Sequence, residues 1–140
     1  DHEGEELLIL FADLDHLKEI NDSFGHIEGD FSIRHCAEVL KKVVGADGIV
    51  GRIGGDEFCV VTLGNLKDGQ QIIERIREES DAFNCTSDKE YYVELSAGCT
   101  SVICRNGLVI ADALREADRA LYEVKKLRRN SVKKNPVMKT

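Results

Sequence analysis

The fold is decided by Leu7-Leu8-Ile9-Leu10-Phe11-Ala12-Asp13, a continuous apolar run that ends abruptly in a carboxylate. A run of this length is typical of a strand that is buried on both faces of a sheet. A strand that ends here presents Asp13 and Asp15 at the edge of the sheet. The residues that follow, 16–24, predict a short helix that Gly25 closes in a left-handed conformation.

Helices and strands follow one another without a strict repeat or a linker. Apolar residues recur at helical spacing over residues 29–44, which predicts a second helix. Residues 49–53 and 57–63 look like two strands joined by Gly54-Gly55-Asp56, a tight hairpin turn in which the glycines would supply positive φ. The pattern predicts an α+β fold with a mainly antiparallel central sheet flanked by helices. The other expected elements are a helix over 67–83, a strand or hairpin arm over 91–103 and a last helix over 111–129.

The composition limits the class of protein. With 140 residues, of which 42% are hydrophobic and 32% charged, the chain suits one globular domain. We expect this domain to cover residues 1–130, and residues 131–140 to form an edge strand or a disordered tail. The net charge of −7 argues against binding to a nucleic-acid duplex, because proteins that bind duplexes usually carry a basic excess.

Cysteine usage and hydropathy indicate the compartment. The five cysteines are odd in number, scattered and form no Cys-x-x-Cys pair, which favours reduced thiols in the cytosol. The longest apolar run, residues 7–12, is too short to span a bilayer and lacks the basic flank of a signal peptide. We therefore expect a soluble, cytoplasmic domain that makes no membrane contact of its own.

The acidic hairpin Gly54-Gly55-Asp56-Glu57-Phe58 is the most specific feature of the sequence. From ordinary residue frequencies, a chance match somewhere in this chain has a probability on the order of one in ten thousand. Two adjacent carboxylates on a glycine turn repel each other, whereas hard oxygen ligands beside a bare backbone suit Mg²⁺ and phosphate. The alternative interpretation is an ordinary solvated hairpin turn.

These five residues are the name motif of the GGDEF family of diguanylate cyclases, and the resemblance covers nearly the whole chain. The resemblance implies the palm-like fold of nucleotidyl cyclases. It also implies that two GTP molecules are condensed into cyclic di-GMP and two pyrophosphates by a Mg²⁺-dependent homodimer, in which each domain supplies a half-site. The further matching segments are Asp13-Leu14-Asp15-His16-Leu17-Lys18-Glu19-Ile20-Asn21-Asp22, similar to the family's first-strand motif, then Gly25-His26, Gly29-Asp30, Lys125 and Arg129.

A metal site is implied by this resemblance. Asp13, the backbone carbonyl of Leu14 and Asp56 would hold two Mg²⁺ ions per GTP, with Mn²⁺ as a substitute, and the ions would bridge the attacking and leaving groups. Asp56 would be the metal-bound proton acceptor, with Glu57 and Lys18 as further catalytic residues. The residues leave open whether a direct base or a metal-activated hydroxyl is used. Taken alone, Asp13 would be interpreted as a turn residue at a strand end.

A guanine site is implied as well. Asn21 and Asp30 resemble the family's guanine readers, because the N1–H and N2–H₂ groups of guanine donate to a carboxylate and its O6 accepts from an amide. A buried Asp30 would be left unpaired by adenine, and such losses discriminate strongly. Asn21 could otherwise be a helix cap. His26 is either part of the substrate site or a structural histidine.

The triphosphate would be bound by cations and bare backbone. The resemblance implies contacts from Lys18, Lys125 and Arg129, together with the backbone amides around Leu17 and the backbone at Gly55. Lys125 and Arg129 are four residues apart and therefore share a helical face. Cations near a helix C-terminus are also explained by the helix dipole alone, so the spacing by itself does not require a substrate.

Two departures from the family pattern matter. The family often carries an Arg-x-x-Asp product-inhibition motif before the hairpin, but the corresponding stretch here is Gly45-Ala46-Asp47-Gly48, so we expect that site to be absent. The family's usual Asp-x-Leu-Thr and Asn-Arg segment before the first strand is also missing. We therefore expect a truncated catalytic piece of a longer protein with an upstream sensory or receiver domain, which could itself be anchored in a membrane.

Three functions are compatible with these residues. The first is an active diguanylate cyclase, favoured because metal ligands, guanine readers and phosphate cations occur together. The second is a catalytically silent GTP-binding regulatory domain, against which Asp13, Asp56 and Glu57 argue. The third is a dinucleotide cyclase of relaxed specificity that also accepts ATP, against which Asp30 argues.

Overall fold

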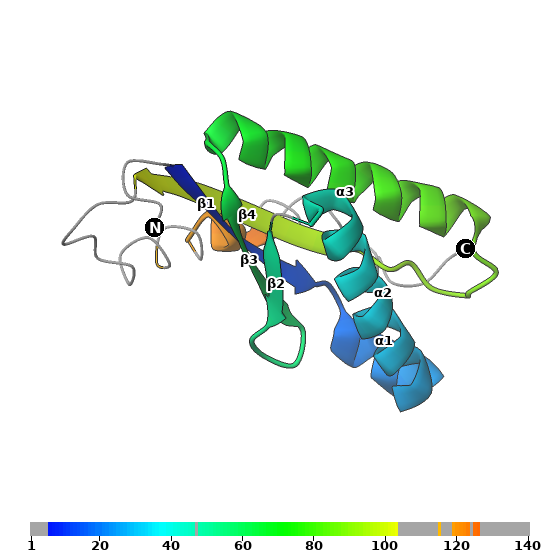
Figure 1. Ribbon diagram of the computed structural model, residues 1–140. Coiled ribbons are helices and arrows are strands. Elements are labelled where there is room, and N and C mark those ends of the chain that lie inside the picture. Colours follow the sequence, from blue (N-terminus) through cyan, green and yellow to red (C-terminus); the bar gives the residue numbers. More distant parts are fainter. Residues whose placement is uncertain (1–5, 47, 104–114, 116–118, 124, 127–140) are drawn as a thin grey trace.

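A four-stranded antiparallel sheet flanked by helices forms the fold (Figure 1), which confirms the expected α+β class. The computed structural model describes residues 6–46, 48–103, 115, 119–123 and 125–126. The strands lie in the order β2-β3-β1-β4 and every neighbouring pair is antiparallel. The elements in chain order are β1 (Glu6–Leu14), α1 (Leu17–Phe24), α2 (His26–Val44), β2 (Ile49–Arg52), β3 (Glu57–Leu63), α3 (Leu66–Thr86) and β4 (Leu95–Ile103).

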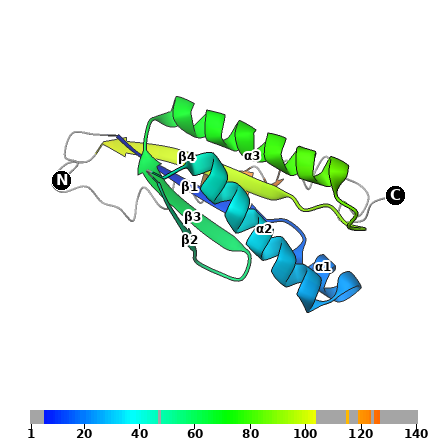
Figure 2. The same cartoon turned by 45° about the vertical axis from the view of Figure 1, so that its right-hand side comes forward.

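Strand β1 is central and apolar on both faces, as its sequence predicts. Leu8 and Leu10 are fully buried, and Leu10 belongs to the main core under α2 and α3. Ile9 points to the other face, where Phe11, Cys59 and Val102 pack against it. Figure 2, in which the molecule is turned by 45°, shows α2 and α3 together on the first of these faces.

Two glycines set the distance between the sheet and the helices. A Cβ at Gly69 in α3 would lie 2.6 Å from Sγ of Cys99, so α3 packs closely on β4. A Cβ at Gly98 would lie 2.3 Å from the backbone nitrogen of Leu121, so the helical residues 119–123 lie against the opposite face of the same strand. The sheet therefore carries helices on both faces.

Some element boundaries differ from the expected ones. Helix α2 begins at His26 rather than residue 29. Gly25, with φ 94° and ψ 164°, is both the C-cap of α1 and the N-cap of α2. That conformation needs glycine but is not the left-handed helical cap that we expected. Helix α3 begins at Leu66, since Asn65 and Asp68 form a capping box, and it continues to Thr86. Strand β4 begins at Leu95, later than expected.

The expectation that Gly54 and Gly55 supply positive φ is wrong. Within the described residues, the glycines with positive φ are Gly25, Gly45 and Gly64. Strand β2 ends at Arg52 and β3 begins at Glu57, so four residues connect the strands. A two-residue hairpin turn requires positive φ, whereas a loop of this length does not.

Several expectations fall on residues outside the described ranges. They concern Asp47, Arg129, most of the expected last helix and the segment 131–140. Residues 115, 119–123 and 125–126 are helical, in agreement with the part of that helix that the structure describes. None of the helices within the described ranges is long and apolar enough to cross a membrane.

Candidate active site

The end of β1 and the acidic hairpin meet at one end of the sheet. Asp13 pairs across the sheet with Glu57 at the start of β3 and with Ser96 in β4. The backbone N–H of Leu14 donates to the backbone carbonyl of Asp56 at 2.8 Å. The structure thus brings Asp56 next to Asp13 and Leu14, although Asp56 lies more than 40 residues further along the sequence.

Arg52 holds the hairpin in shape. Its guanidinium donates to the carbonyl of Gly54 at 3.0 Å from Nε and to the carbonyl of Gly55 at 2.7 Å from Nη2. A Cβ at Gly54 would lie 3.2 Å from a carboxylate oxygen of Glu57, while a Cβ at Gly55 would meet nothing within 4 Å. Gly55 therefore leaves open space beside the backbone, which is what a bulky anion would need. Nothing in the sequence pattern alone indicates this role for Arg52.

Asp13 is a buried carboxylate with a cation beside it. The ammonium of Lys125 donates to Oδ2 of Asp13, and only 9% of the Asp13 side chain is exposed. Burial raises the pKa of Asp13 to about 6, the Lys125 ammonium opposes this rise, and the neighbouring Asp56 carboxylate adds to it. Lys125 thus lies at the candidate site, and the phosphate contact that the resemblance implies stays a prediction.

Burial and charge act in opposite directions on Lys125. Burial lowers the pKa of Lys125, but the hydrogen bond and charge of Asp13, followed by the charges of Asp15 and Asp56, outweigh this, so the pKa is raised overall. Lys125 is therefore charged at neutral pH. Three carboxylates act on one ammonium, so negative charge dominates this end of the sheet.

Asp15 is a further buried carboxylate at this edge, and it is not among the predicted site residues. Its two carboxylate oxygens accept from the hydroxyl of Ser96, at 3.0 Å and 2.8 Å, and its backbone N–H donates to the carbonyl of Glu94 at 2.9 Å. These contacts connect the chain after β1 to β4. The signal was present in the sequence, since Asp15 follows directly after the apolar run that ends at Asp13.

The turn between β1 and α1 presents backbone amides. His16 adopts a left-handed conformation with φ 62°, which is uncommon for a residue other than glycine and often marks a functional site. Among the described residues no side chain caps α1, so the first amides of this helix, from Leu17 and Lys18, have no helical partner. Lys18 is exposed, whereas Leu17 packs against the core.

The candidate guanine readers lie on the two helices that follow. The side chain of Asn21 lies against the backbone of Gly29, where a Cβ would be 1.8 Å from its Oδ1. Asp30 and His26 are both exposed. Asp30 is therefore not buried in the protein by itself, where α1 and the start of α2 project beyond the end of the sheet (Figure 1).

The donor set fits a divalent cation held together with a substrate. Oδ1 of Asp13 is buried and, within the described part of the chain, has no hydrogen-bond partner. No group of three or more His, Cys, Asp or Glu side chains that could hold a metal occurs among the described residues. Mg²⁺ is usually bound by one or two carboxylates plus substrate phosphates rather than by a complete protein cage. Two carboxylates and the Leu14 carbonyl match that pattern.

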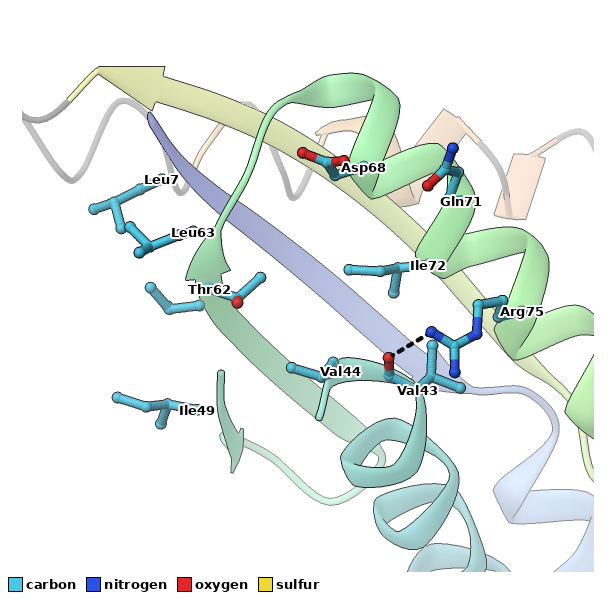
Figure 3. Close-up of a pocket in the computed structure, with 11 residues that line it drawn as sticks. Leu7, Val43, Val44, Ile49, Thr62, Leu63, Asp68, Gln71, Ile72 and Arg75 are labelled. Atoms are coloured by element: carbon cyan, nitrogen blue, oxygen red, sulfur yellow. Dashed lines mark hydrogen bonds between the residues drawn. The ribbon is translucent and has the colours of Figure 1, made fainter. Parts of the chain in front are cut away.

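A pocket of about 650 Å³ lies at the other end of β1 (Figure 3). Its floor is apolar, and Arg75 at its rim donates to the carbonyl of Val43 at 3.2 Å. Leu7 from the start of β1 and Leu63 from the end of β3 line it, whereas Asp13 and Asp56 do not. This pocket is therefore separate from the candidate active site, and it flanks the stretch between Val44 and Ile49.

Comparison with known proteins identifies the class. Residues 1–131 match the family described as diguanylate cyclase, GGDEF domain, and the chain belongs to this family. It is 38% identical over 128 residues to diguanylate cyclase DgcP of Escherichia coli, covering 89% of this chain and 37% of that protein. It is 35% identical over 132 residues to DgcP of Pseudomonas aeruginosa, covering 91% of this chain and 19% of that protein.

Solved structures agree with the fold. The active GGEEF domain of a diguanylate cyclase from Vibrio cholerae superposes with a TM-score of 0.78 at 31% identity, covering 88% of this chain and 78% of that one. The GGDEF domain of DgcB from Caulobacter crescentus, solved in complex with c-di-GMP, gives 0.77 at 27% identity, covering 88% and 74%. The chain spans about 19–41% of the length of its curated relatives, so it corresponds to one domain of those larger proteins.

Proposed function

We propose that this chain is an active diguanylate cyclase domain, which condenses two GTP molecules into cyclic di-GMP and two pyrophosphates as a homodimer. The observation that carries the proposal is the meeting of Asp13 and Asp56 beside the backbone of Leu14. Oδ1 of Asp13 has no hydrogen-bond partner among the residues that the structure describes, and there is open space next to Gly55. A structural hairpin turn has no need of this arrangement, because it concentrates like charges at the end of a buried strand.

The proposed reaction forms two phosphodiester bonds. The 3′-hydroxyl of one GTP attacks the α-phosphorus of the other, the bond from that phosphorus to the β-phosphate oxygen breaks, and pyrophosphate leaves. The hydroxyl proton passes to an acceptor on the protein or to water, and the same step repeated in the other direction closes the ring. Divalent cations bound at Asp13, Asp56 and the Leu14 carbonyl would make the 3′-hydroxyl more acidic and neutralise charge on the phosphates.

The charged residues that the family resemblance names have proposed roles. Asp56 accepts the 3′-hydroxyl proton, and Glu57 beside it is a further catalytic residue. Lys18, Lys125 and Arg129, with the amides around Leu17, stabilise the charge that develops on the departing pyrophosphate. The resemblance to the family is the basis for Arg129, which lies outside the described residues.

Guanine selection is proposed to come from α1 and α2. The amide of Asn21 donates to O6, and the carboxylate of Asp30 accepts from N1–H and N2–H₂. Adenine offers no matching pair of donors at that edge, so GTP is preferred over ATP. His26 stays a candidate contact only. Because each domain holds one GTP, two domains must face each other for the reaction, and a two-fold symmetric arrangement follows.

One experiment separates the three candidate functions. The domain is incubated with Mg²⁺ and labelled GTP and ATP, and the products are resolved chromatographically. A cyclic guanine dinucleotide supports the proposal, a mixed adenine–guanine product supports relaxed specificity, and GTP binding without product supports a silent regulatory domain. Because isolated domains can dimerise weakly, the assay is repeated at increasing protein concentration. Asp56→Ala should abolish turnover, and unchanged turnover would refute its role.

A further inference from the structure

The carboxylate of Glu28, in the first turns of α2, is bound from two directions. The hydroxyl of Tyr91 donates to Oε1 of Glu28 at 2.6 Å, and Nζ of Lys89 lies 2.9 Å from the same oxygen. Tyr91 and Lys89 come from the segment before β4, more than 60 residues further along the chain. A charged acceptor makes such hydrogen bonds stronger than neutral ones.

Aromatic packing surrounds this contact. Tyr91 is only 1% exposed, and its ring centroid lies 5.0 Å from that of Phe24 at the end of α1. Nζ of Lys89 also lies 4.5 Å from the centroid of Phe31 in α2. The segment that carries Tyr91 and Lys89 therefore contacts both α1 and α2.

The segment is itself fixed to α3. The side chain of Asn84 accepts from the backbone N–H of Val93 at 2.9 Å and donates to its carbonyl at 3.0 Å. Such paired bonds hold an extended backbone in one register. A continuous path of contacts thus runs from α3 through Asn84, Val93 and Tyr91 to Glu28.

Glu28 lies two residues before Asp30, and successive residues of a helix turn by about 100°. The two carboxylates therefore point to nearly opposite sides of α2, so fixing Glu28 on the inner side fixes the direction of Asp30 on the outer side. Asn21 is tied to the same unit through its contact with Gly29. The orientation of both candidate guanine readers depends on how this helical pair is held.

We propose that Tyr91 and Glu28 are positioning residues that hold α1 and the start of α2 in the orientation needed for guanine recognition by Asn21 and Asp30. This inference rests on the proposed function, because it assumes that Asn21 and Asp30 contact the base. This role requires no contact of Tyr91 or Glu28 with the nucleotide. Their effect is on the angle at which Asp30 is presented.

The charges of the pair suit this role at physiological pH. The hydrogen bond from Tyr91 and the salt bridge from Lys89 hold the pKa of Glu28 below its usual value. Burial and the Glu28 carboxylate raise the pKa of Tyr91 to about 12. Glu28 is therefore ionised and Tyr91 protonated across the physiological range, so the contact is constant rather than a switch.

Equilibrium binding of GDP and IDP with Mg²⁺ tests the proposal. GDP and IDP differ only by the 2-amino group, from which Asp30 would accept a hydrogen bond. They are not substrates because they cannot release pyrophosphate. We expect the wild-type chain to prefer GDP, and Asp30→Ala to abolish that preference. Tyr91→Phe, which removes one oxygen atom, should lower the ratio of the two dissociation constants by roughly threefold or more, because misplacement by about 1 Å weakens oriented contacts.

Two further variants make the test specific. Tyr92→Phe removes the hydroxyl of the neighbouring, 37% exposed tyrosine and should leave the ratio unchanged. Glu28→Gln keeps an oxygen acceptor for Tyr91 and should lower the ratio less than Glu28→Ala does, with folding of every variant checked by thermal melting. A wild-type ratio in both Tyr91→Phe and Glu28→Ala would overturn the positioning role while leaving the proposed function intact. A wild-type chain that binds GDP and IDP equally would overturn guanine recognition and the positioning role together.

Discussion

Lys125 donates a hydrogen bond to Asp13, and this contact joins a helix late in the chain to the end of the first strand. The ammonium lies beside a carboxylate that the proposed function assigns to a divalent cation. Only one of the two carboxylate oxygens is engaged, since Oδ1 has no partner within the described residues. The protein thus balances part of the negative charge of this site with its own cation.

Replacing Lys125 should therefore strengthen metal binding in the absence of nucleotide. We expect Lys125→Gln to bind Mn²⁺ alone about threefold to tenfold more tightly, since a nearby like charge is removed from the site. Turnover should fall, because the same variant loses a proposed phosphate contact. Electron paramagnetic resonance titration of Mn²⁺ measures the first effect, with Lys126→Gln as the control. Equal affinities in wild type and Lys125→Gln would contradict this interpretation.

Gly29→Ala should impair base recognition more than stability. The new Cβ would overlap Oδ1 of Asn21, the end of a flexible side chain that can move away. Alanine is favoured over glycine within helices by about 1 kcal/mol, which offsets part of the cost of the displacement. We expect weaker GDP binding with a melting temperature close to that of the wild type. Adding Asn21→Ala should cause little further loss, since both changes remove the same contact.

The matched control for this prediction is Gly51→Ala, where a Cβ would meet nothing within 4 Å. Its nucleotide affinity should equal that of the wild type. If Gly29→Ala binds GDP normally, or if its loss adds fully to that of Asn21→Ala, the contact between Gly29 and Asn21 has no part in recognition.

Stability should decrease as the pH is lowered through the titration of His35. Its ring packs on Phe83 with centroids 3.9 Å apart, and its buried Nε2 has no hydrogen-bond partner among the described residues. Burial lowers the pKa of His35, and the charges of Glu38 and Glu79 oppose this only in part. A histidine with a lower pKa in the folded state binds fewer protons than in the unfolded state, so its contribution is present above pH 6.5 and is lost on acidification.

Thermal melting between about pH 7.5 and about pH 5.5 measures this effect. His35→Phe should melt with a smaller dependence on pH over that range than the wild type, and should keep the aromatic contact. A variant with the wild-type pH dependence would assign the acid sensitivity to other groups.

Excess cyclic di-GMP should not inhibit the domain through the surface between α2 and β2. The stretch from Gly45 to Gly48 carries no arginine, and the guanidinium of Arg75 in the adjoining pocket is bonded to the Val43 carbonyl. Any inhibition by product should therefore compete with GTP. A calorimetric titration that finds tight product binding, abolished by Asp47→Ala, would overturn this prediction.

The sheet and its acidic end could be predicted because strong local signals specify them. A continuous apolar run ending in Asp13 identifies β1, and Gly54-Gly55-Asp56-Glu57-Phe58 identifies the hairpin. The register that joins Leu14 to Asp56 follows from pairing between distant segments, which hydropathy alone does not encode. The ion pair of Lys125 with Asp13 joins still more distant residues and depends on how the last helix packs.

Other parts of the site depend on three-dimensional context. The glycines of the hairpin were predicted to have positive φ, but a four-residue loop makes that conformation unnecessary. Among the described residues, the glycines with positive φ are Gly25, Gly45 and Gly64. The exposure of Asp30 depends on how far α2 extends past the sheet, which its own sequence does not indicate. The contact of Tyr91 with Glu28 cannot be recognised from the sequence, because a tyrosine and a glutamate 63 positions apart form no motif.

The missing side chain at Gly98 has a consequence for the chemistry of the site. Because nothing separates the backbone of β4 from that of residues 120–121, the spacing between two layers of the fold determines how far the Lys125 ammonium reaches. A single methyl group at position 98 would lift the helix and withdraw the positive charge from Asp13. The position of a positive charge at one end of this domain thus depends on how closely two backbones approach each other several residues away.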